Sequence, residues 1–196
     1  MISLTKGQRI VLTKDGEDGL KNIAVGLGWD EKKSGFFGGM FSSNDDIDCD
    51  ASAFLMKDGK IQDRDDIVYY GHLSHKSNAV KHTGDNLTGA GDGDDETIYV
   101  SLDKVPNNID SILFVVNIYQ ADNRNQHFGM IENAFIRVYN RDNKEELCKF
   151  KLTDDFKGMT ALVCAEIYKK DGEWKFRAIG EGTKANTAME LAKKYM

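Results

Sequence analysis

Acidic side chains are concentrated in two stretches of the chain that contain neither Lys nor Arg. The first, residues 44–56, includes Asp48 and Asp50. The second, residues 84–96, carries five carboxylates, an Asn amide and four glycines. Like charges at this density repel one another unless a cation lies between them. Carboxylate, amide and backbone carbonyl oxygens on a glycine-rich chain suit Ca²⁺, which takes about six to eight oxygen ligands. The two stretches therefore predict a calcium site.

The same two stretches account for the net charge of the protein. Acids outnumber bases 32 to 26, which gives a net charge of −6 at pH 7. This is the wrong sign for holding a nucleic acid or an anionic membrane, so we expect neither as a partner. Nine of the acids lie in the two stretches, and without them 23 acids face the 26 bases. Nine carboxylates are more than one Ca²⁺ requires, so we expect two neighbouring ions.

The segments that must position these acids alternate with a period of two, which is typical of β-strands. Within residues 47–55 this alternation puts Asp48 and Asp50 on one face, about 7 Å apart along the strand, and Cys49 and Ala51 on the other. Residues 109–119 form a continuous apolar run, which predicts a central strand buried on both faces. Asp171-Gly172 predicts a tight hairpin. The other predicted strands are 9–13, 23–29, 66–70, 97–102, 135–139, 146–152, 160–168 and 173–179.

These strands, followed by one helix over residues 185–195, predict a mainly β fold. We expect a two-sheet antiparallel β-sandwich with a C-terminal helix and long calcium-binding loops, in a single domain of residues 1–196. Cys49, Cys148 and Cys164 form no Cys-x-x-Cys pair and are expected to be small buried side chains. The sequence shows neither a signal peptide nor a run of about 20 apolar residues, so we expect a cytoplasmic protein with no integral membrane segment.

Other interpretations of the chemistry stay open at this point. A solvated acidic turn is the alternative to a calcium loop. The order of residues after Asp92 does not fit an EF-hand, and a strand follows instead of a helix. His72, His75 and His82 are interpreted as loop or surface imidazoles because no clustered Cys accompanies them. Segment 34–43, rich in Gly and Phe, is either a plug over a sheet edge, which we favour, or a mobile flap.

Five segments together resemble the TerD family of tellurium-resistance and bacterial stress proteins. They are residues 84–96 (GDNLTGAGDGDDE), 25–30 (VGLGWD), 48–53 (DCDASA), 114–119 (FVVNIY) and 173–180 (EWKFRAIG). The resemblance implies a cytoplasmic, calcium-binding β-sandwich linked to resistance against tellurite and other stresses, with no established catalytic activity. Some relatives have been described as binding cyclic AMP.

The resemblance also implies which residues hold the ions. The carboxylate ligands would come from both acidic stretches, and the loop would add an amide and backbone carbonyl oxygens. The carboxylates are Asp48, Asp50, Asp85, Asp92, Asp94, Asp95 and Glu96, and the further oxygen donors are Asn86, Gly89 and Gly93.

We predict a calcium-binding stress-response protein that is not an enzyme and that acts by ion-dependent stabilisation or by recruiting partners, among them other stress or tellurium-resistance proteins. A metal-dependent phosphoester hydrolase is one alternative, with His82 as the nearest acid or base. A protein that binds cyclic AMP at the acidic site is another. An inert sandwich that only binds partners is the third.

Overall fold

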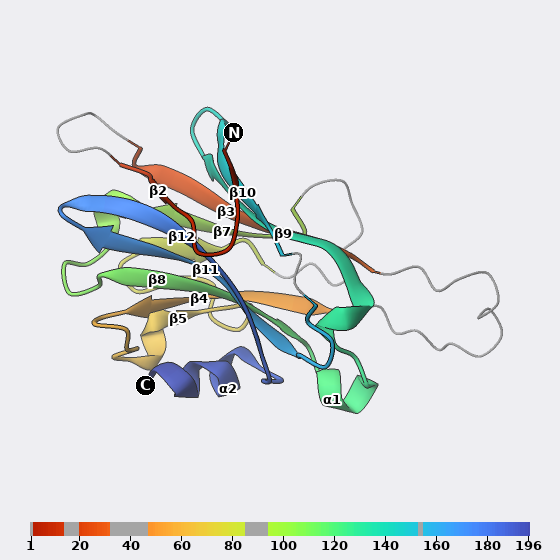
Figure 1. The fold of residues 1–196 in the computed structure, drawn as a ribbon. Coiled ribbons are helices and arrows are strands. Elements are labelled where there is room, and N and C mark those ends of the chain that lie inside the picture. The colour runs from red at the N-terminus through yellow and green to blue at the C-terminus, as the bar shows by residue number, and fades with distance from the viewer. Residues whose placement is uncertain (1, 14–19, 32–46, 85–93, 153–154) are drawn as a thin grey trace.

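The computed structural model of the chain describes residues 2–13, 20–31, 47–84, 94–152 and 155–196. Its strands form two six-stranded sheets that pack face to face, which confirms the predicted mainly β, two-sheet fold (Figure 1). In spatial order the first sheet contains β1 (Ile2–Leu4), β10 (Glu146–Lys151), β9 (Ile131–Asn140), β3 (Asn22–Glu31), β7 (Glu96–Ser101) and β6 (Val80–His82). The second sheet contains β2 (Arg9–Val11), β12 (Glu173–Thr183), β11 (Ala161–Lys170), β8 (Ser111–Ile118), β4 (Cys49–Met56) and β5 (Ile67–Val68).

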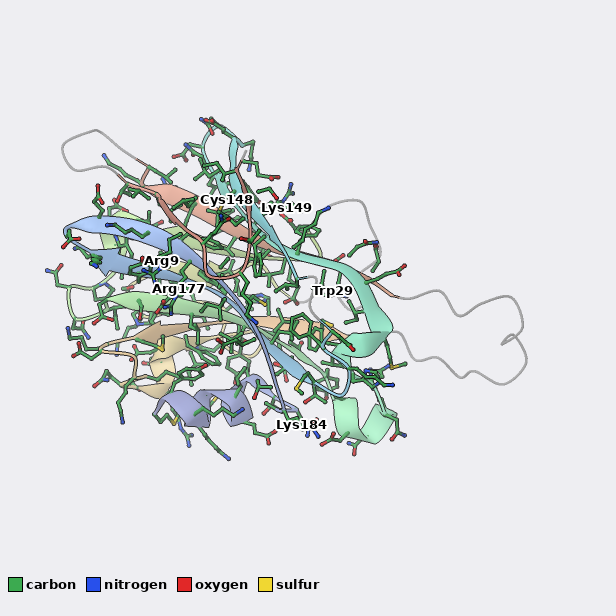
Figure 2. All side chains as sticks on the ribbon, in the orientation of Figure 1. Arg9, Trp29, Cys148, Lys149, Arg177 and Lys184 are labelled. Atoms are coloured by element: carbon green, nitrogen blue, oxygen red, sulfur yellow. The ribbon has the colours of Figure 1, made fainter. Side chains whose placement is uncertain are left out.

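Neighbouring strands run antiparallel with one exception, since β1 pairs with β10 in parallel. The chain passes from β1 in the first sheet to β2 in the second through Gly7, whose φ of 81° suits glycine. β2 is the edge strand of the second sheet beside β12, where Arg9 pairs directly with Arg177. The two arginine side chains lie close together on these strands (Figure 2).

The hairpin between β11 and β12 forms where Asp171-Gly172 predicts it. Both residues have positive φ angles, 57° at Asp171 and 80° at Gly172. Two consecutive positive φ angles are required by the type I′ turn, whose twist matches that of the flanking strands. This hairpin is therefore confirmed in position and in its physical cause.

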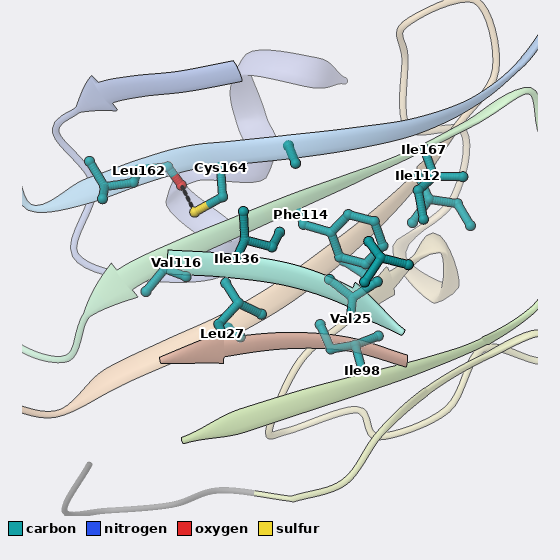
Figure 3. Packing of buried hydrophobic residues seen from close by; sticks show 14 of the residues in the cluster. Val25, Leu27, Ile98, Ile112, Phe114, Val116, Ile136, Leu162, Cys164 and Ile167 are labelled. Atoms are coloured by element: carbon teal, nitrogen blue, oxygen red, sulfur yellow. Dashed lines mark hydrogen bonds between the residues drawn. The ribbon is translucent and has the colours of Figure 1, made fainter. Parts of the chain in front are cut away.

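The main core lies between the sheets. Inward-facing side chains of the first sheet, such as Val25 and Ile136, meet those of the second, such as Phe114 and Ile167 (Figure 3). Cys49, Cys148 and Cys164 are all buried, as predicted. The Cys164 thiol lies 3.9 Å from the carbonyl oxygen of Leu162, within the apolar surroundings. Burial raises the pKa of both Cys148 and Cys164 to about 12, so these thiols stay protonated at neutral pH.

A second apolar cluster covers the outer face of the second sheet. It joins Phe54, Leu113 and Val115 to Leu191 of helix α2 (Ala188–Ala192). Because α2 lies over this face, β8 is buried along its whole length, as its apolar run predicts. The remaining short helices are α1 (Ala121–Arg124), η1 (Arg64–Asp66), η2 (Leu102–Lys104), η3 (Phe128–Met130) and η4 (Lys193–Tyr195).

The C-terminal helix begins later than residue 185. Thr187 caps it by accepting a hydrogen bond from the Glu190 N–H (3.1 Å), and the Glu190 carboxylate accepts one from the Asn186 N–H (2.8 Å). The last turn tightens into the 3₁₀ helix η4. No helix among the described residues has the length and apolar character needed to cross a membrane.

Candidate functional site

The acidic strand is β4, and its fully buried environment comes from the two apolar clusters. Cys49 and Ala51 face the core between the sheets, so Asp50 points to the opposite side of the strand. The Asp50 side chain is 3% exposed, and its Oδ2 accepts a hydrogen bond from Asn117 Nδ2 (3.3 Å), directly across the ladder on β8. Asp48 is half-buried, and its carbonyl oxygen accepts the Tyr119 N–H at 2.7 Å.

The end of the acidic loop is held at the start of β7. Glu96 is 1% exposed, and its Oε2 accepts a hydrogen bond from the Ala51 N–H at 2.5 Å. This contact joins the first sheet to β4 of the second sheet, at the part of β4 that β5 does not reach. The other oxygen, Oε1, is buried and has no hydrogen-bond partner among the described residues. Glu96 is therefore a buried carboxylate with one oxygen available to another ligand.

Asp95 is anchored beside Glu96 by the neighbouring strand β3. Its N–H donates to the Leu27 carbonyl, and its Oδ2 accepts the Trp29 N–H, both at 2.8 Å. Burial raises the pKa of Asp95 to about 6, and the negative charges of Asp30, Asp94 and Glu96 add to the rise although the Trp29 N–H opposes it. Burial and neighbouring negative charge therefore dominate the surroundings of this carboxylate.

Asp94 differs from the other acids because an arginine already pairs with it. Its two carboxylate oxygens accept from Nε and Nη2 of Arg137, at 2.7 Å and 3.1 Å. Arg137 also donates to Glu146 (3.0 Å), and the hydrogen bonds to Asp94 raise the arginine's pKa. The Asp94 carboxylate packs directly against Gly26 of β3, where the Cβ of any other residue would collide with it. Asp94 would have to weaken this bidentate pair to bind a metal ion.

The two acidic elements approach the same thiol, although they are far apart in the sequence. Burial raises the pKa of Cys49 well above its usual value, and the charges of Asp50, Glu96, Asp48 and Asp95 raise it further. Two of these carboxylates come from the β4 stretch and two from the loop before β7. The fold therefore brings Asp48 and Asp50 of the first stretch and Asp95 and Glu96 of the second within electrostatic range of one thiol, whereas Asp94 is not among them.

The remaining predicted ligands, Asp85, Asn86, Gly89, Asp92 and Gly93, lie outside the described residues, and so does segment 34–43. Within the described part of the chain, no group of three or more His, Cys, Asp or Glu side chains is arranged to hold a metal ion. The complete predicted ligand set therefore stays a prediction.

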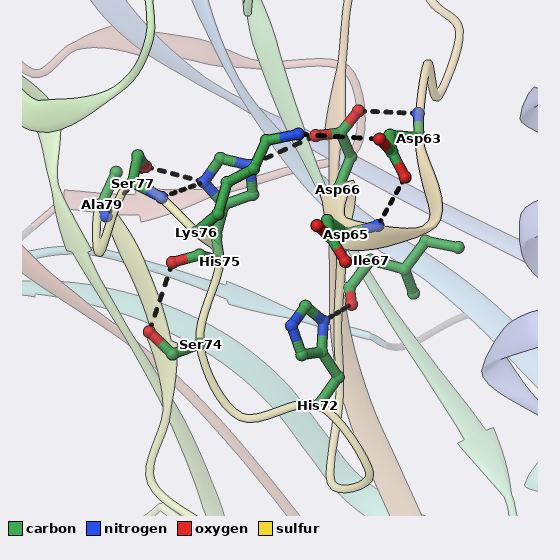
Figure 4. Close-up of polar contacts among 10 residues, drawn as sticks. All are labelled: Asp63, Asp65, Asp66, Ile67, His72, Ser74, His75, Lys76, Ser77 and Ala79. Carbon is green, nitrogen blue, oxygen red and sulfur yellow. Dashed lines mark hydrogen bonds and ion pairs between the residues drawn. The ribbon is translucent and has the colours of Figure 1, made fainter.

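The histidines correct one interpretation. His82 is buried, its Nδ1 accepts the Gly84 N–H (3.0 Å), and its Nε2 lies 3.4 Å from Glu96 Oε2. His75 is 1% exposed, with Nε2 3.2 Å from Asp66 Oδ1 and Nδ1 2.7 Å from Ser77 Oγ (Figure 4). The interpretation as loop or surface imidazoles is therefore wrong for His82, which is a buried residue of strand β6, whereas His75 lies in a loop as predicted but is buried there. His75 contacts Asp66 through one nitrogen and Ser77 through the other, because a buried imidazole can bond at both nitrogens.

Two polar partners of the acids were not predicted from the sequence. Arg137 is the outward residue of an ordinary alternating strand, 43 positions from Asp94. Asn117 interrupts the apolar run of β8 opposite Asp50, and a polar residue in such a run is the one hint that could have been used.

Comparison with known proteins adds an independent line of information. Residues 1–195 match the family described as the TerD domain. Stress response protein SCP2 of Bacillus subtilis (strain 168) is 51% identical over 200 residues, which cover 100% of this chain and 99% of that protein. Tellurium resistance protein TerD of Serratia marcescens is 44% identical over 182 residues, 92% of this chain and 90% of that protein. The crystal structure of a telluride resistance protein (TerD) homologue from Streptomyces coelicolor A3(2) has the same fold, with a TM-score of 0.67 at 22% identity, covering 91% of this chain and 99% of that one.

Proposed function

Because the chain belongs to the TerD family, whose members compared above are named as tellurium-resistance and stress proteins, we propose that it is a calcium-binding stress-response protein. In this proposal the ion stabilises the fold at the junction of β4 and β7 and thereby prepares the protein to meet its partners. Neither role requires turnover of a substrate.

The observation that carries the proposal is the environment of Glu96. An ionised carboxylate buried between two sheets needs hydrogen bonds or positive charge to offset its lost hydration. Ala51 donates one hydrogen bond to it. His82 also faces it, with Nε2 3.4 Å from Glu96 Oε2 and with Nδ1 accepting the Gly84 N–H. A cation near Oε1 would supply the missing positive charge.

The neighbours of Glu96 suit calcium better than a transition metal. Asp48, Asp50, Asp95 and Glu96 are hard oxygen donors whose charges all raise the pKa of the buried Cys49 thiol, which therefore stays protonated and is not a ligand. Calcium accepts many such oxygens in irregular geometry, whereas magnesium requires a near-ideal octahedron. We propose that the ligands predicted from the loop, Asp85, Asn86, Gly89, Asp92, Gly93 and Asp94, complete the coordination of two ions.

The proposed ions act on folding by mass action. An ion that binds the folded chain and not the unfolded chain raises the free energy of unfolding by about 2.7 kcal/mol at one hundred times its Kd. Asp50 lies in β4 of the second sheet and Glu96 in β7 of the first, so an ion bound by acids of both stretches would link the sheets as well as reduce the repulsion. The acidic site would repel a tellurium oxyanion unless bound calcium reverses the local field. We therefore propose stress resistance through the ion-loaded fold, with other stress or tellurium-resistance proteins as its partners.

The deciding experiment is calorimetric titration of the full chain with Ca²⁺ and separately with Mg²⁺, combined with thermal melts in EDTA. We expect Ca²⁺ to bind and to raise Tm, and Mg²⁺ to do so much more weakly. An unchanged Tm at saturating Ca²⁺ would contradict the proposal.

Hydrolysis or nucleotide binding at the same acids is favoured less. The His82 side chain is fully buried against Glu96 and would need to be exposed to reach a phosphoester. Turnover of a phosphoester panel, or a calorimetric signal with cyclic AMP, that disappears in Glu96→Gln would revive these alternatives.

A further inference from the structure

Helix α2 covers only part of the outer face of the second sheet, and two adjoining cavities open beside it. One has a volume of about 480 Å³ and the other about 430 Å³. They share Arg9, Gly59, Glu166 and Arg177 in their linings. Ligand cavities typically measure about 300–1,000 Å³, so either is large enough for a small organic molecule.

The floor of the larger cavity is apolar and its rim is charged. Met56, Leu113 and Val163 form the floor together with Ile179, all at the margin of the cluster under α2. Tyr195 of η4 closes one side. Burial raises the pKa of the Tyr195 phenol, and the charges of Glu181 and Glu166 add to the rise. The ring therefore stands between the apolar floor and the polar rim.

Positive charge exceeds negative charge around these cavities, in contrast to the protein as a whole. Five Lys or Arg residues and three Asp or Glu residues contribute to the two linings, whereas the complete chain has a net charge of −6. One of the three acids, Asp110, already accepts from the Asp58 N–H at 2.9 Å and pairs with Lys57 at 3.4 Å. A local surplus of cations on an acidic protein favours an anionic ligand.

The centre of this charge is the cross-strand pair of Arg9 and Arg177. Like charges directly opposite each other on neighbouring strands destabilise a sheet. Glu166, the next residue across the ladder, neutralises only one of them, with its Oε2 2.7 Å from Arg177 Nη2. Among the described residues no carboxylate pairs with Arg9, and the buried Nε of Arg177 has no hydrogen-bond acceptor. An anion placed here would offset the repulsion and accept hydrogen bonds from the exposed guanidinium of Arg9.

We propose that this surface, which we call the Arg9–Arg177 cleft, binds a small amphipathic anion. Its carboxylate or phosphate head lies at the two arginines, and its apolar body lies on Met56, Leu113 and Val163 beside Tyr195. The cleft does not use the acidic residues of the proposed calcium site, so this activity is independent of the calcium proposal.

The test is calorimetric titration of the full chain with octanoate, octyl phosphate, butyrate and octylammonium at fixed ionic strength, with and without calcium. We expect both octyl anions to bind and octylammonium not to bind. Octanoate should bind more than about tenfold tighter than butyrate, because each buried CH₂ favours binding. The ratio of octyl phosphate to octanoate affinity distinguishes a phosphate from a carboxylate ligand.

Three variants locate the head group. Arg9→Met should weaken octanoate about tenfold or more through the loss of charged hydrogen bonds, and Arg9→Lys should restore part of the affinity. Arg64→Met is the matched control, since Arg64 is exposed and lies outside both linings, and it should bind octanoate like the wild type. Arg177→Met is a second test if its melt shows a folded protein.

Equal binding of octanoate and octylammonium, or wild-type binding by Arg9→Met, would overturn the proposal. The absence of heat with both octyl anions at millimolar concentration would do the same. Equal affinity for octanoate and butyrate would show that the apolar floor of the cleft does not bind the ligand's hydrocarbon chain, and would overturn that part of the proposal.

Discussion

Replacing Glu96 with glutamine tests the proposed calcium site at its most buried carboxylate. The carbonyl oxygen of the introduced glutamine side chain can keep the hydrogen bond from Ala51, so the junction of β4 and β7 retains its main contact. The new amide group stands where Oε1 has no partner among the described residues, at a cost of about 1–3 kcal/mol. Relief from burying an uncompensated charge acts in the opposite direction. In EDTA we therefore expect a Tm within a few degrees of that of the wild type.

The calcium response should change far more than the ion-free stability. At a free calcium concentration of one hundred times the wild-type Kd, the wild type gains about 2.7 kcal/mol. If the lost carboxylate weakens binding about one hundredfold, the same concentration equals the variant's Kd and contributes about 0.4 kcal/mol. For a chain of this length one kcal/mol corresponds to about 2–4 °C. The calcium-induced rise in Tm should therefore fall from about 5–11 °C to about 1–2 °C.

The assay is a pair of thermal melts, in EDTA and in calcium, for the wild type, Glu96→Gln and the control Glu145→Gln. Glu145 is exposed in the turn between β9 and β10, so its substitution removes the same charge away from the site. Trp29, whose N–H donates to Asp95, provides a second signal through its fluorescence in a Trp174→Phe background. A full calcium response in Glu96→Gln, or an equal loss in Glu145→Gln, would refute the reasoning.

Three further outcomes follow from the contacts described above. Gly26→Ala should lower the free energy of unfolding by about 1–2 kcal/mol, because the new Cβ displaces Asp94 from Arg137, and denaturant melts should show a smaller loss when Asp94→Ala is already present. The raised pKa of Asp95 means that its protonated form favours folding, so its contribution is fully present below pH 3.8 and is lost as pH rises through about 6. In EDTA, Asp95→Asn should therefore flatten the change of Tm between pH 5 and pH 7, and an unchanged slope would contradict the assignment. Phe114→Ala should cost about 3–5 kcal/mol in denaturant melts, since the ring is fully buried between the sheets, and a loss below about 1 kcal/mol would show that the core closes over the cavity.

The parts of the fold that could be predicted are those with a local cause. The apolar run of residues 109–119 became β8, and Asp171-Gly172 became the hairpin of β11 and β12, because side-chain alternation and turn geometry act over a few residues. The three-residue strands β1 and β6 escaped prediction, since so short a segment carries too little alternation. The parallel pairing of β1 with β10 depends on a contact nearly 150 positions away, which no local pattern encodes.

The candidate site also has a part that local sequence patterns predict and a part that depends on distant contacts. Charge repulsion within residues 84–96 predicts that the loop needs a cation, and the alternation of residues 47–55 separates Asp50 from Cys49 correctly. The contact of Glu96 with the Ala51 N–H spans 45 positions, and the pairing of Asp94 with Arg137 spans 43. The first contact is set by how the two sheets stack and the second by the order of β9, β3 and β7 within one sheet. Because neither arrangement is local, the sequence could name the acids but not which of them already has a basic partner.

The net charge of this protein says less about its ligands than the local charge at each place on its surface. The outer face of the second sheet carries Asp50 on β4 and the arginine pair of β2 and β12, and the apolar cluster under α2 lies on the same face. Charges separated beyond a Debye length of about 10 Å act almost independently in salt. A net charge of −6 excludes a general polyanion binder, but it does not describe the surface around Arg9. The same chain can therefore attract a cation at its buried acids and an anion at its paired arginines, and each site must be argued from its own neighbours.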